Sequence, residues 1–244
     1  METFDHRDLT GAEFRECGLD RVRMVGVSMR DAVIEGEVVN LVVNGVEVGA
    51  YVEEELDRRH PERPLLRSAD PAELREGWRR LQADWTATIE RVRAMPPGAE
   101  RSRIHGEWSV SETLRHLVFA VDAWFRRGVL GVESPYTKLG IAGAWLTGDD
   151  LPTVQEALDD HADPSFDEVL AVRAERVAEL AAWLDAADTA TLAAPRPPLE
   201  TEGWPPHQEG YSVLDALHVV LNEEWWHRRF VERDLDKLGA GRAS

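Results

Sequence analysis

The chain has 244 residues, of which 43% are hydrophobic and 30% are charged, and its formal net charge is −18 at pH 7. This composition is typical of a globular protein with one large domain, or one domain and a small addition. The acidic balance argues against nucleic acid as a partner, because excess acidic groups do not neutralise a phosphate backbone. No apolar run approaches the ~20 residues of a membrane span, so we expect no membrane partner either.

Cys17 is the one cysteine of the chain, which rules out an internal disulfide. The first residues, Met1 to His6, have neither the basic nor the apolar segment of a secretion signal. Both observations predict that the protein is cytoplasmic, in a reducing compartment.

A five-residue period runs through the first forty residues. Apolar side chains recur at every fifth position, namely Phe4, Leu9, Phe14, Leu19, Met24, Met29, Ile34 and Val39. A period of five fits neither a helix nor a strand and is typical of solenoids, whose units bury their apolar residues by stacking. The segment resembles the pentapeptide-repeat family, which implies a short right-handed β-solenoid of about two coils. It departs from that family because the flanking Asn or Asp is mostly missing and Glu37 replaces a small residue. An irregular β-rich lobe is the alternative.

The end of this lobe contains Asn44-Gly45 between β-rich runs, which predicts a hairpin. Proline and charged residues at 60–64 then interrupt the pattern, so we place the first domain at residues 1–60. The lobe contains no acid–base constellation, and we interpret it as a packing or partner-binding structure.

Four amphipathic helices are predicted between residues 70 and 240, with apolar side chains at helical spacing. The first begins at the N-cap Asp70 and ends near Met95, and the second begins with the capping box of Ser109 and Glu112 and ends near Arg127. The others cover about 166–184 and 212–238. The fold class is therefore mainly α, an up-and-down four-helix bundle after a short β lobe.

Two of the connections between these helices are long, about 37 and about 26 residues, and loops of this length in compact domains are usually functional. They carry a set of aromatic and histidine residues: Tyr136, Trp145, His161, Trp204 and His207. These side chains either line a binding site for an apolar substrate or cap the end of the bundle.

Glu223 and His227 are one turn apart on the last predicted helix, so a carboxylate and an imidazole can point at the same place. With a third ligand they would form the open, three-ligand arrangement of a catalytic metal. His116, at the edge of the apolar face of the second helix, is a candidate for that ligand. The alternative is a hydrogen-bonded histidine of the core.

The motif Trp108-Ser-Val-x-Glu112-x-Leu-x-His116-Leu, followed by Glu223-x-x-x-His227 and Asp234-Leu235, resembles the DinB/YfiT-like superfamily. The resemblance covers residues 70–238 and is greatest to the branch that includes mycothiol-dependent maleylpyruvate isomerase. It implies a four-helix bundle with a divalent metal, zinc or else nickel or another transition metal, bound by His116, Glu223 and His227.

The resemblance also implies a metal-dependent enzyme that acts on a small electrophilic molecule. It would be a thiol S-transferase or isomerase that uses a low-molecular-weight thiol, or else a hydrolase. Glu224 is a candidate general base, and its alternative is a partly buried ion pair with Arg228 one turn away. The remaining alternative is a non-catalytic metal-binding or partner-binding protein associated with stress. Bundles of this kind often pair, so we expect a homodimer.

Overall fold

The computed structural model describes residues 3–15, 17–36, 38–143, 146, 152–159, 161–206 and 210–240. Its contacts divide the chain into two units, Met1–Gly49 and Ala50–Ser244. Each unit is described separately below.

The first unit contains a two-stranded antiparallel hairpin of β1 (Val42–Val43) and β2 (Val46–Glu47), in which Val43 pairs with Val46. The turn residues Asn44 and Gly45 both have positive φ, at 51° and 84°. Two successive left-handed residues form the turn that favours Asn-Gly, so the predicted hairpin is confirmed.

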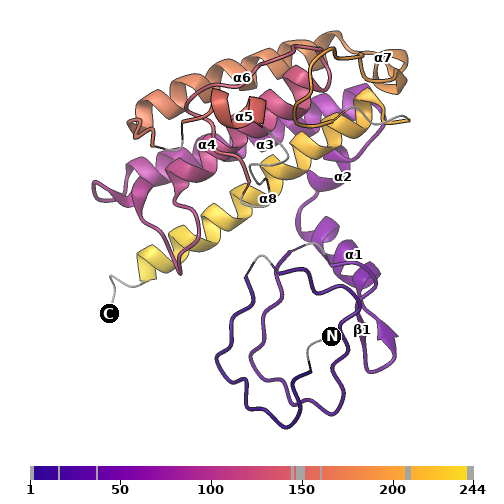
Figure 1. Cartoon of the computed structure of the whole chain (residues 1–244), viewed down its shortest axis with the longest axis vertical. Helices are drawn as coiled ribbons and strands as arrows, with labels where there is room; N and C mark the ends of the chain where they lie inside the picture. Colours follow the sequence, from indigo (N-terminus) through magenta and orange to yellow (C-terminus); the bar gives the residue numbers. More distant parts are fainter. Residues whose placement is uncertain are drawn as a thin grey trace. The chain divides into compact units, whose positions relative to one another are not determined.

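The five-residue period reappears in the backbone φ angles of the first unit, whose chain follows a winding path in Figure 1. Positive φ angles recur two residues after the apolar positions, at His6, Gly11, Arg21, Gly26, Asp31 and Gly36. Strands among the described residues of this unit are limited to the hairpin, and the periodic apolar side chains are exposed, for example Phe4 at 58% and Met24 at 54%. Repeats bury their apolar side chains only by stacking on one another. A segment with so few repeats therefore leaves apolar side chains in solvent. The β-solenoid stays a prediction, and Glu37 lies outside the described residues.

The segment after the hairpin is helical, whereas the sequence placed the β lobe as far as residue 60. α1 covers Gly49–Arg59 and the short α2 covers Arg63–Leu66. Glu55 forms ion pairs with Arg58 and Arg59, three and four residues later. This spacing stabilises a helix, and it is the feature of the sequence that favours a helix here over a β structure.

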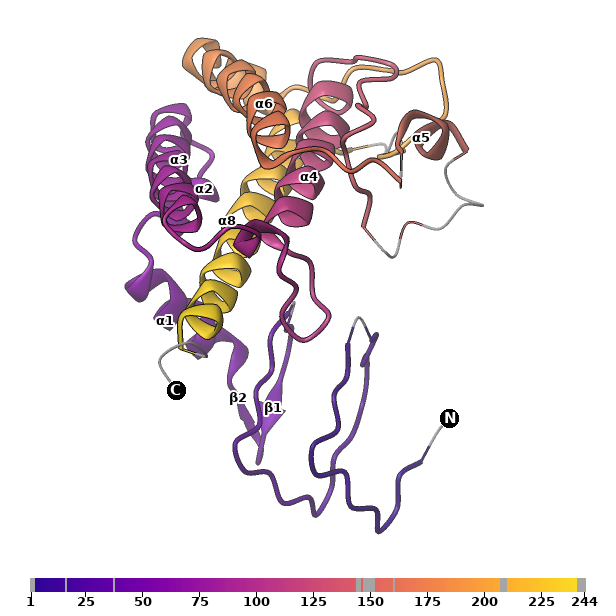
Figure 2. The ribbon, with the colours of Figure 1, turned by 90° about the vertical axis from the view of Figure 1, so that its left-hand side faces the viewer.

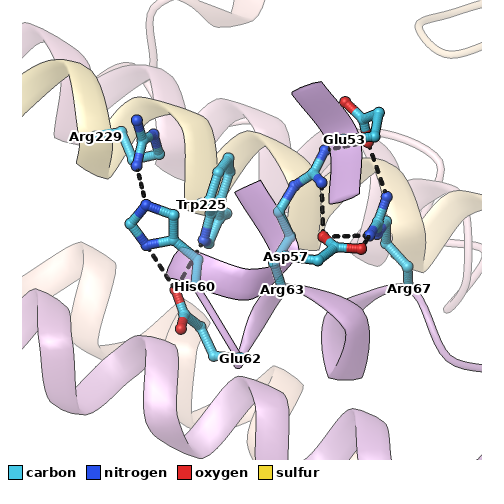
Figure 3. Close-up of polar contacts among 8 residues, drawn as sticks. All are labelled: Glu53, Asp57, His60, Glu62, Arg63, Arg67, Trp225 and Arg229. Carbon is cyan, nitrogen blue, oxygen red and sulfur yellow. Dashed lines mark hydrogen bonds and ion pairs between the residues drawn. The ribbon is translucent and has the colours of Figure 1, made fainter. Parts of the chain in front are cut away.

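The turn between α1 and α2 is fixed to the last helix, α8 (Val213–Ala240), by the contacts of Figure 3. Trp225 donates a hydrogen bond from Nε1 to Glu62 Oε1 at 3.0 Å, and His60 packs edge-on against the Trp225 ring. Arg229 donates to His60 Nε2. These contacts make the turn part of the second unit.

Four long helices form the core of the second unit: α3 (Pro71–Arg93), α4 (Val110–Ala120), α6 (Phe166–Ala186) and α8. α4 continues as one π-helical stretch, η2 (Val121–Arg127). The ends of these helices lie within about two residues of those predicted, because each N-terminus carries the capping residue that the sequence shows. Large apolar side chains of α3, α4 and α8 are fully buried between them, among them Leu81, Trp85, Leu114, Leu117, Leu217 and Leu221.

The predicted up-and-down order of the helices is wrong at one step, between α4 and α6. Asp122 contacts Arg176 and Arg126 contacts Glu179, so α4–η2 and α6 run parallel. Thr88 and Arg91 contact Glu232, and Arg91 also contacts Asp236, so α3 and α8 run parallel as well. The order is therefore up, down, down, up; the four helices are labelled in Figure 1 and, after a quarter turn, in Figure 2. The connection 128–165 is long enough to bring the chain back to the end of the bundle at which α4 begins. α6 can therefore run in the same direction as α4.

The connections contain three short helices: η1 (Ala99–Arg101), α5 (Pro152–Ala157) and α7 (Thr189–Ala193). Both long connections contribute to a second, small core around Phe119, Ala123 and Val154, against which Tyr136 and Trp204 pack. Among the described residues, no helix has the length and apolar character needed to cross a membrane.

Candidate metal centre

α4 carries His116, whose side chain is almost completely buried. The helix is positioned by its capping box, in which Ser109 Oγ accepts from Glu112 N and Glu112 accepts from Ser109 N. His116 Nδ1 lies 3.0 Å from the carbonyl oxygen of Ile141. A carbonyl can only accept, so Nδ1 carries the proton, and the lone pair of a neutral ring is on Nε2.

α8 brings two further side chains to His116 Nε2. Glu223 Oε2 lies 3.4 Å from His116 Nε2 and 3.0 Å from His227 Nε2. One potential ligand atom from each of His116, Glu223 and His227 lies within 4.8 Å of the other two. The structure therefore brings together the three residues that the sequence analysis named as metal ligands.

The electrostatics of this group fit a bound cation. Burial disfavours the charged form of Glu223, but hydrogen bonds and charge from His116 and His227 outweigh it and lower its pKa to about 2. The carboxylate is thus ionised at neutral pH and faces His116 Nε2, the nitrogen that has a lone pair when the ring is neutral. Two acceptors at that distance require a proton or a metal ion between them. Two imidazoles and a carboxylate are ligands that suit zinc and neighbouring transition metals.

Aromatic rings surround the two histidines. The Trp108 ring lies 4.7 Å from the His116 ring and is stacked 6.1 Å from the His227 ring, measured between centroids. Phe230 meets His227 edge-on at 5.8 Å, and Phe119 lies 6.2 Å from His116. Glu223 and His227 keep part of their surface exposed while His116 does not, so solvent reaches the group from the α8 side.

Glu224, the predicted general base, does not join this group. Its side chain has no exposed surface, and both carboxylate oxygens accept from Arg173 of α6 at 2.6 Å. The predicted ion pair with Arg228 is wrong, because Arg228 turns toward Thr88 and Asp84 of α3. A buried salt bridge is therefore the role that the geometry favours for Glu224.

The aromatic residues of the long loops have a structural role where they are described. Tyr136 donates a hydrogen bond to the carbonyl oxygen of Trp204 and stacks on Phe119 at 5.9 Å. Burial raises the pKa of Tyr136 to about 12. His161 is exposed and lies outside the metal-ligand group. Trp145 and His207 fall outside the described residues.

Two residues next to the site were not among those predicted from the sequence. Ile141 acts through its backbone carbonyl, which no side-chain pattern reveals. Arg115 directly precedes His116, and its guanidinium donates to the carbonyl oxygens of Leu139, Asp159 and Ala162. A buried arginine inside an apolar helix face was the one signal of this role in the sequence.

A protein-family model matches the part of the chain that carries this site. The model described as the DinB superfamily matches residues 80–231, which is more than half of the chain and includes all three candidate ligands. Comparisons with curated proteins and with solved structures found no match.

Proposed function

Since the chain belongs to the DinB superfamily, we propose that it is a divalent-metal-dependent enzyme with His116, Glu223 and His227 as its metal ligands. The observation that carries this proposal is the convergence of the three ligand atoms within 4.8 Å, from two helices that are far apart in sequence. Zinc is the ion we propose, because the set of two histidines and one carboxylate is common at catalytic zinc sites.

Three protein ligands leave a coordination position free for a reactant. A divalent ion there would act as a Lewis acid and lower the pKa of a thiol or water beside it. The chain's own residues prepare this chemistry. Ile141 fixes the orientation of the His116 ring, and Trp108 and Phe230 pack against the His227 ring.

The reaction we propose is transfer of a low-molecular-weight thiol to a small electrophilic molecule, or an isomerisation that uses such a thiol, with hydrolysis as the variant that uses water. The thiol would come from a small molecule, because Cys17 is the one cysteine of the sequence and belongs to the first unit. The resemblance to the mycothiol-dependent branch supports the thiol. The single cysteine also supports a place in the reducing cytosol.

A partner-binding role is the second candidate function, and a specific observation favours it. Among the described residues of the first unit, sixteen large apolar side chains are exposed, from Phe4 to Val46. Exposed apolar surface of this kind marks protein interaction sites. A β-solenoid in this unit and a homodimer of the whole chain both remain compatible with it.

The first experiment is elemental mass spectrometry of protein purified without a metal-binding tag. We expect one zinc or similar ion per wild-type chain and its loss in His227→Ala. His218→Ala is the matched control, because His218 lies on the same helix but contacts the carbonyl oxygen of Ser68 instead. The control should keep the ion.

A wild type that takes up no ion, even after reconstitution, would refute the metalloenzyme and leave the partner-binding role. If the ion is present, turnover of electrophiles with and without added thiols separates the transferase from the hydrolase. A loaded protein that is inactive with both would favour a binding role.

A further inference from the structure

The segment 137–143 lies directly over α4 at His116. The Ile141 amide donates to the carbonyl oxygen of Arg115 at 3.4 Å, and its own carbonyl oxygen accepts from His116 Nδ1 at 3.0 Å. Gly140 is packed so closely that a Cβ there would lie 3.1 Å from Leu158 and 3.3 Å from the Cβ of Phe119. The position of the Ile141 carbonyl therefore depends on how firmly this segment is attached.

Arg115 makes that attachment. Its side chain is 8% exposed, and it donates from Nε to Leu139 O at 2.7 Å and from Nη1 to Ala162 O at 3.0 Å. Leu139 belongs to the segment over His116, whereas Ala162 lies near the end of the same long connection. A planar guanidinium donates in several fixed directions at once, which an ammonium group on a flexible chain does not.

We infer that Arg115 is a positioning residue for His116, and this inference rests on the proposed function. By fixing residues 139–141 against α4, Arg115 holds the Ile141 carbonyl where it accepts the Nδ1 proton. His116 Nε2 is then the ring nitrogen left to bind a metal ion, and it is directed at Glu223 and His227. A carbonyl or carboxylate on the second nitrogen of a histidine ligand fixes its tautomer and its orientation.

The test uses the full-length chain with ¹⁵N-labelled histidine, free of metal. In the wild type we expect a slowly exchanging imidazole N–H resonance, assigned to His116 Nδ1 by its absence in His116→Gln. Arg115→Lys and Arg115→Gln should lose this resonance through exchange with water. Arg101→Gln is the control, because Arg101 donates to Pro164 O near the end of the same connection but does not contact residues 139–141. The control should keep the resonance.

The second measurement is zinc affinity by competition with a chromophoric chelator. We expect roughly 10- to 100-fold weaker binding for Arg115→Lys, in the range typical for partners that orient a ligand. Circular dichroism identifies a variant that fails to fold, and the lysine variant decides the question if glutamine unfolds the protein.

The outcomes separate the two proposals. A wild type that binds no zinc refutes the proposed function, while the resonance still tests Arg115. A resonance that persists in folded Arg115→Lys and Arg115→Gln overturns the positioning role. Wild-type zinc affinity in these variants also overturns it and leaves the metal site in place.

Discussion

Glu224 and Arg173 form a salt bridge in the core of the bundle, with both side chains almost fully buried. The Arg173 guanidinium also lies 4.9 Å from the centroid of the Trp85 ring. Removing one charge of such a pair leaves the other uncompensated in a region of low polarity. We expect Glu224→Gln to lower the free energy of unfolding by roughly 3 to 5 kcal/mol, measured by urea denaturation.

The control is the double variant Arg173→Met with Glu224→Met, which removes both charges and should recover most of the lost stability. Glu224→Gln should also keep the bound ion, since Glu224 is not among the three candidate ligands. A variant as stable as the wild type, but inactive when loaded with metal, would instead support the catalytic role predicted for Glu224.

The candidate metal ligands could be found from the sequence, but their surroundings could not. Glu223 and His227 are related by the geometry of a single helix, which spacing alone reveals. The ion-pair partner of Glu224 could be identified only by knowing which helix lies beside α8. Sequence offered Arg228 as the nearest cation, whereas tertiary packing supplied Arg173 from 51 residues away.

The N-terminus of α4 depends on the charge of Glu112. Burial raises the pKa of this carboxyl group, but contacts with Arg103 and Ser109 outweigh it and lower the pKa to about 2. The stability that this charge contributes is fully present above the ordinary value of 4.5 and is lost as the pH falls toward 2. We expect Glu112→Gln to cost about 1 to 2 kcal/mol at pH 7 and progressively less at lower pH.

Urea denaturation at a series of pH values between 7 and 2.5 would measure this difference. The equivalent variant of the α6 capping box, Glu168→Gln, is the comparison, because Ser165 alone accounts for the lowered pKa of Glu168. The loss of stability in Glu112→Gln should be the larger of the two at pH 7. A loss that does not change with pH would show that the charge of Glu112 is irrelevant to the helix.

α1 has no buried residue and is held to the rest of the second unit by ion pairs and by the partly buried Leu56. Arg63 of α2 binds Asp57 and Glu53 of α1 at 2.7 Å and lies over the Trp225 ring, as Figure 3 shows. We expect Arg63→Gln to accelerate hydrogen–deuterium exchange in α1 while the exchange of α3 and α8 stays unchanged. Exchange followed by mass spectrometry measures this directly.

Arg58→Gln is the matched control for α1, because Arg58 pairs with Glu55 inside the helix and not with α2. Its effect on exchange should be small, as for most exposed pairs within a helix. Equal protection of α1 in the wild type and in Arg63→Gln would mean that apolar contacts such as Leu56 suffice to hold it.

Helix positions in the bundle could be predicted closely, whereas helix directions could not. Capping residues such as Asp70 and Ser109 act locally and leave a mark in the sequence. Apolar periodicity is the same whichever way a helix runs in the bundle, so it carries no information on direction. Only the length of the 128–165 connection indicated that the chain could cross the bundle between α4 and α6.

The boundary between the two units lies earlier than the sequence indicated. Contacts separate the units between Gly49 and Ala50, whereas the prolines near residue 61 favoured a boundary at 60–70. The second unit includes α1 and α2 because Leu66 is buried in its core and Glu62 accepts from Trp225. Both contacts join segments that are distant in sequence. Prolines mark only a local interruption of the chain and do not predict such contacts.

Two fragments test this boundary. We expect residues 50–244 to unfold in a single cooperative transition and to bind metal as the full chain does, because this fragment keeps the entire core and all three candidate ligands. Residues 70–244 should be less stable by several kcal/mol, because the loss of Leu66 exposes part of the core and the loss of Glu62 leaves Trp225 Nε1 without its acceptor.

Thermal unfolding followed by circular dichroism measures both fragments against the full chain. If the two fragments melt at the same temperature, α1 and α2 are accessory and the boundary predicted from the sequence is the better one. If residues 50–244 alone fail to fold, the first unit contributes to the stability of the second. In that case the exposed apolar side chains of residues 3–49 would be the first place to look for the missing contacts, because sixteen of the nineteen exposed large apolar side chains of the described residues lie there.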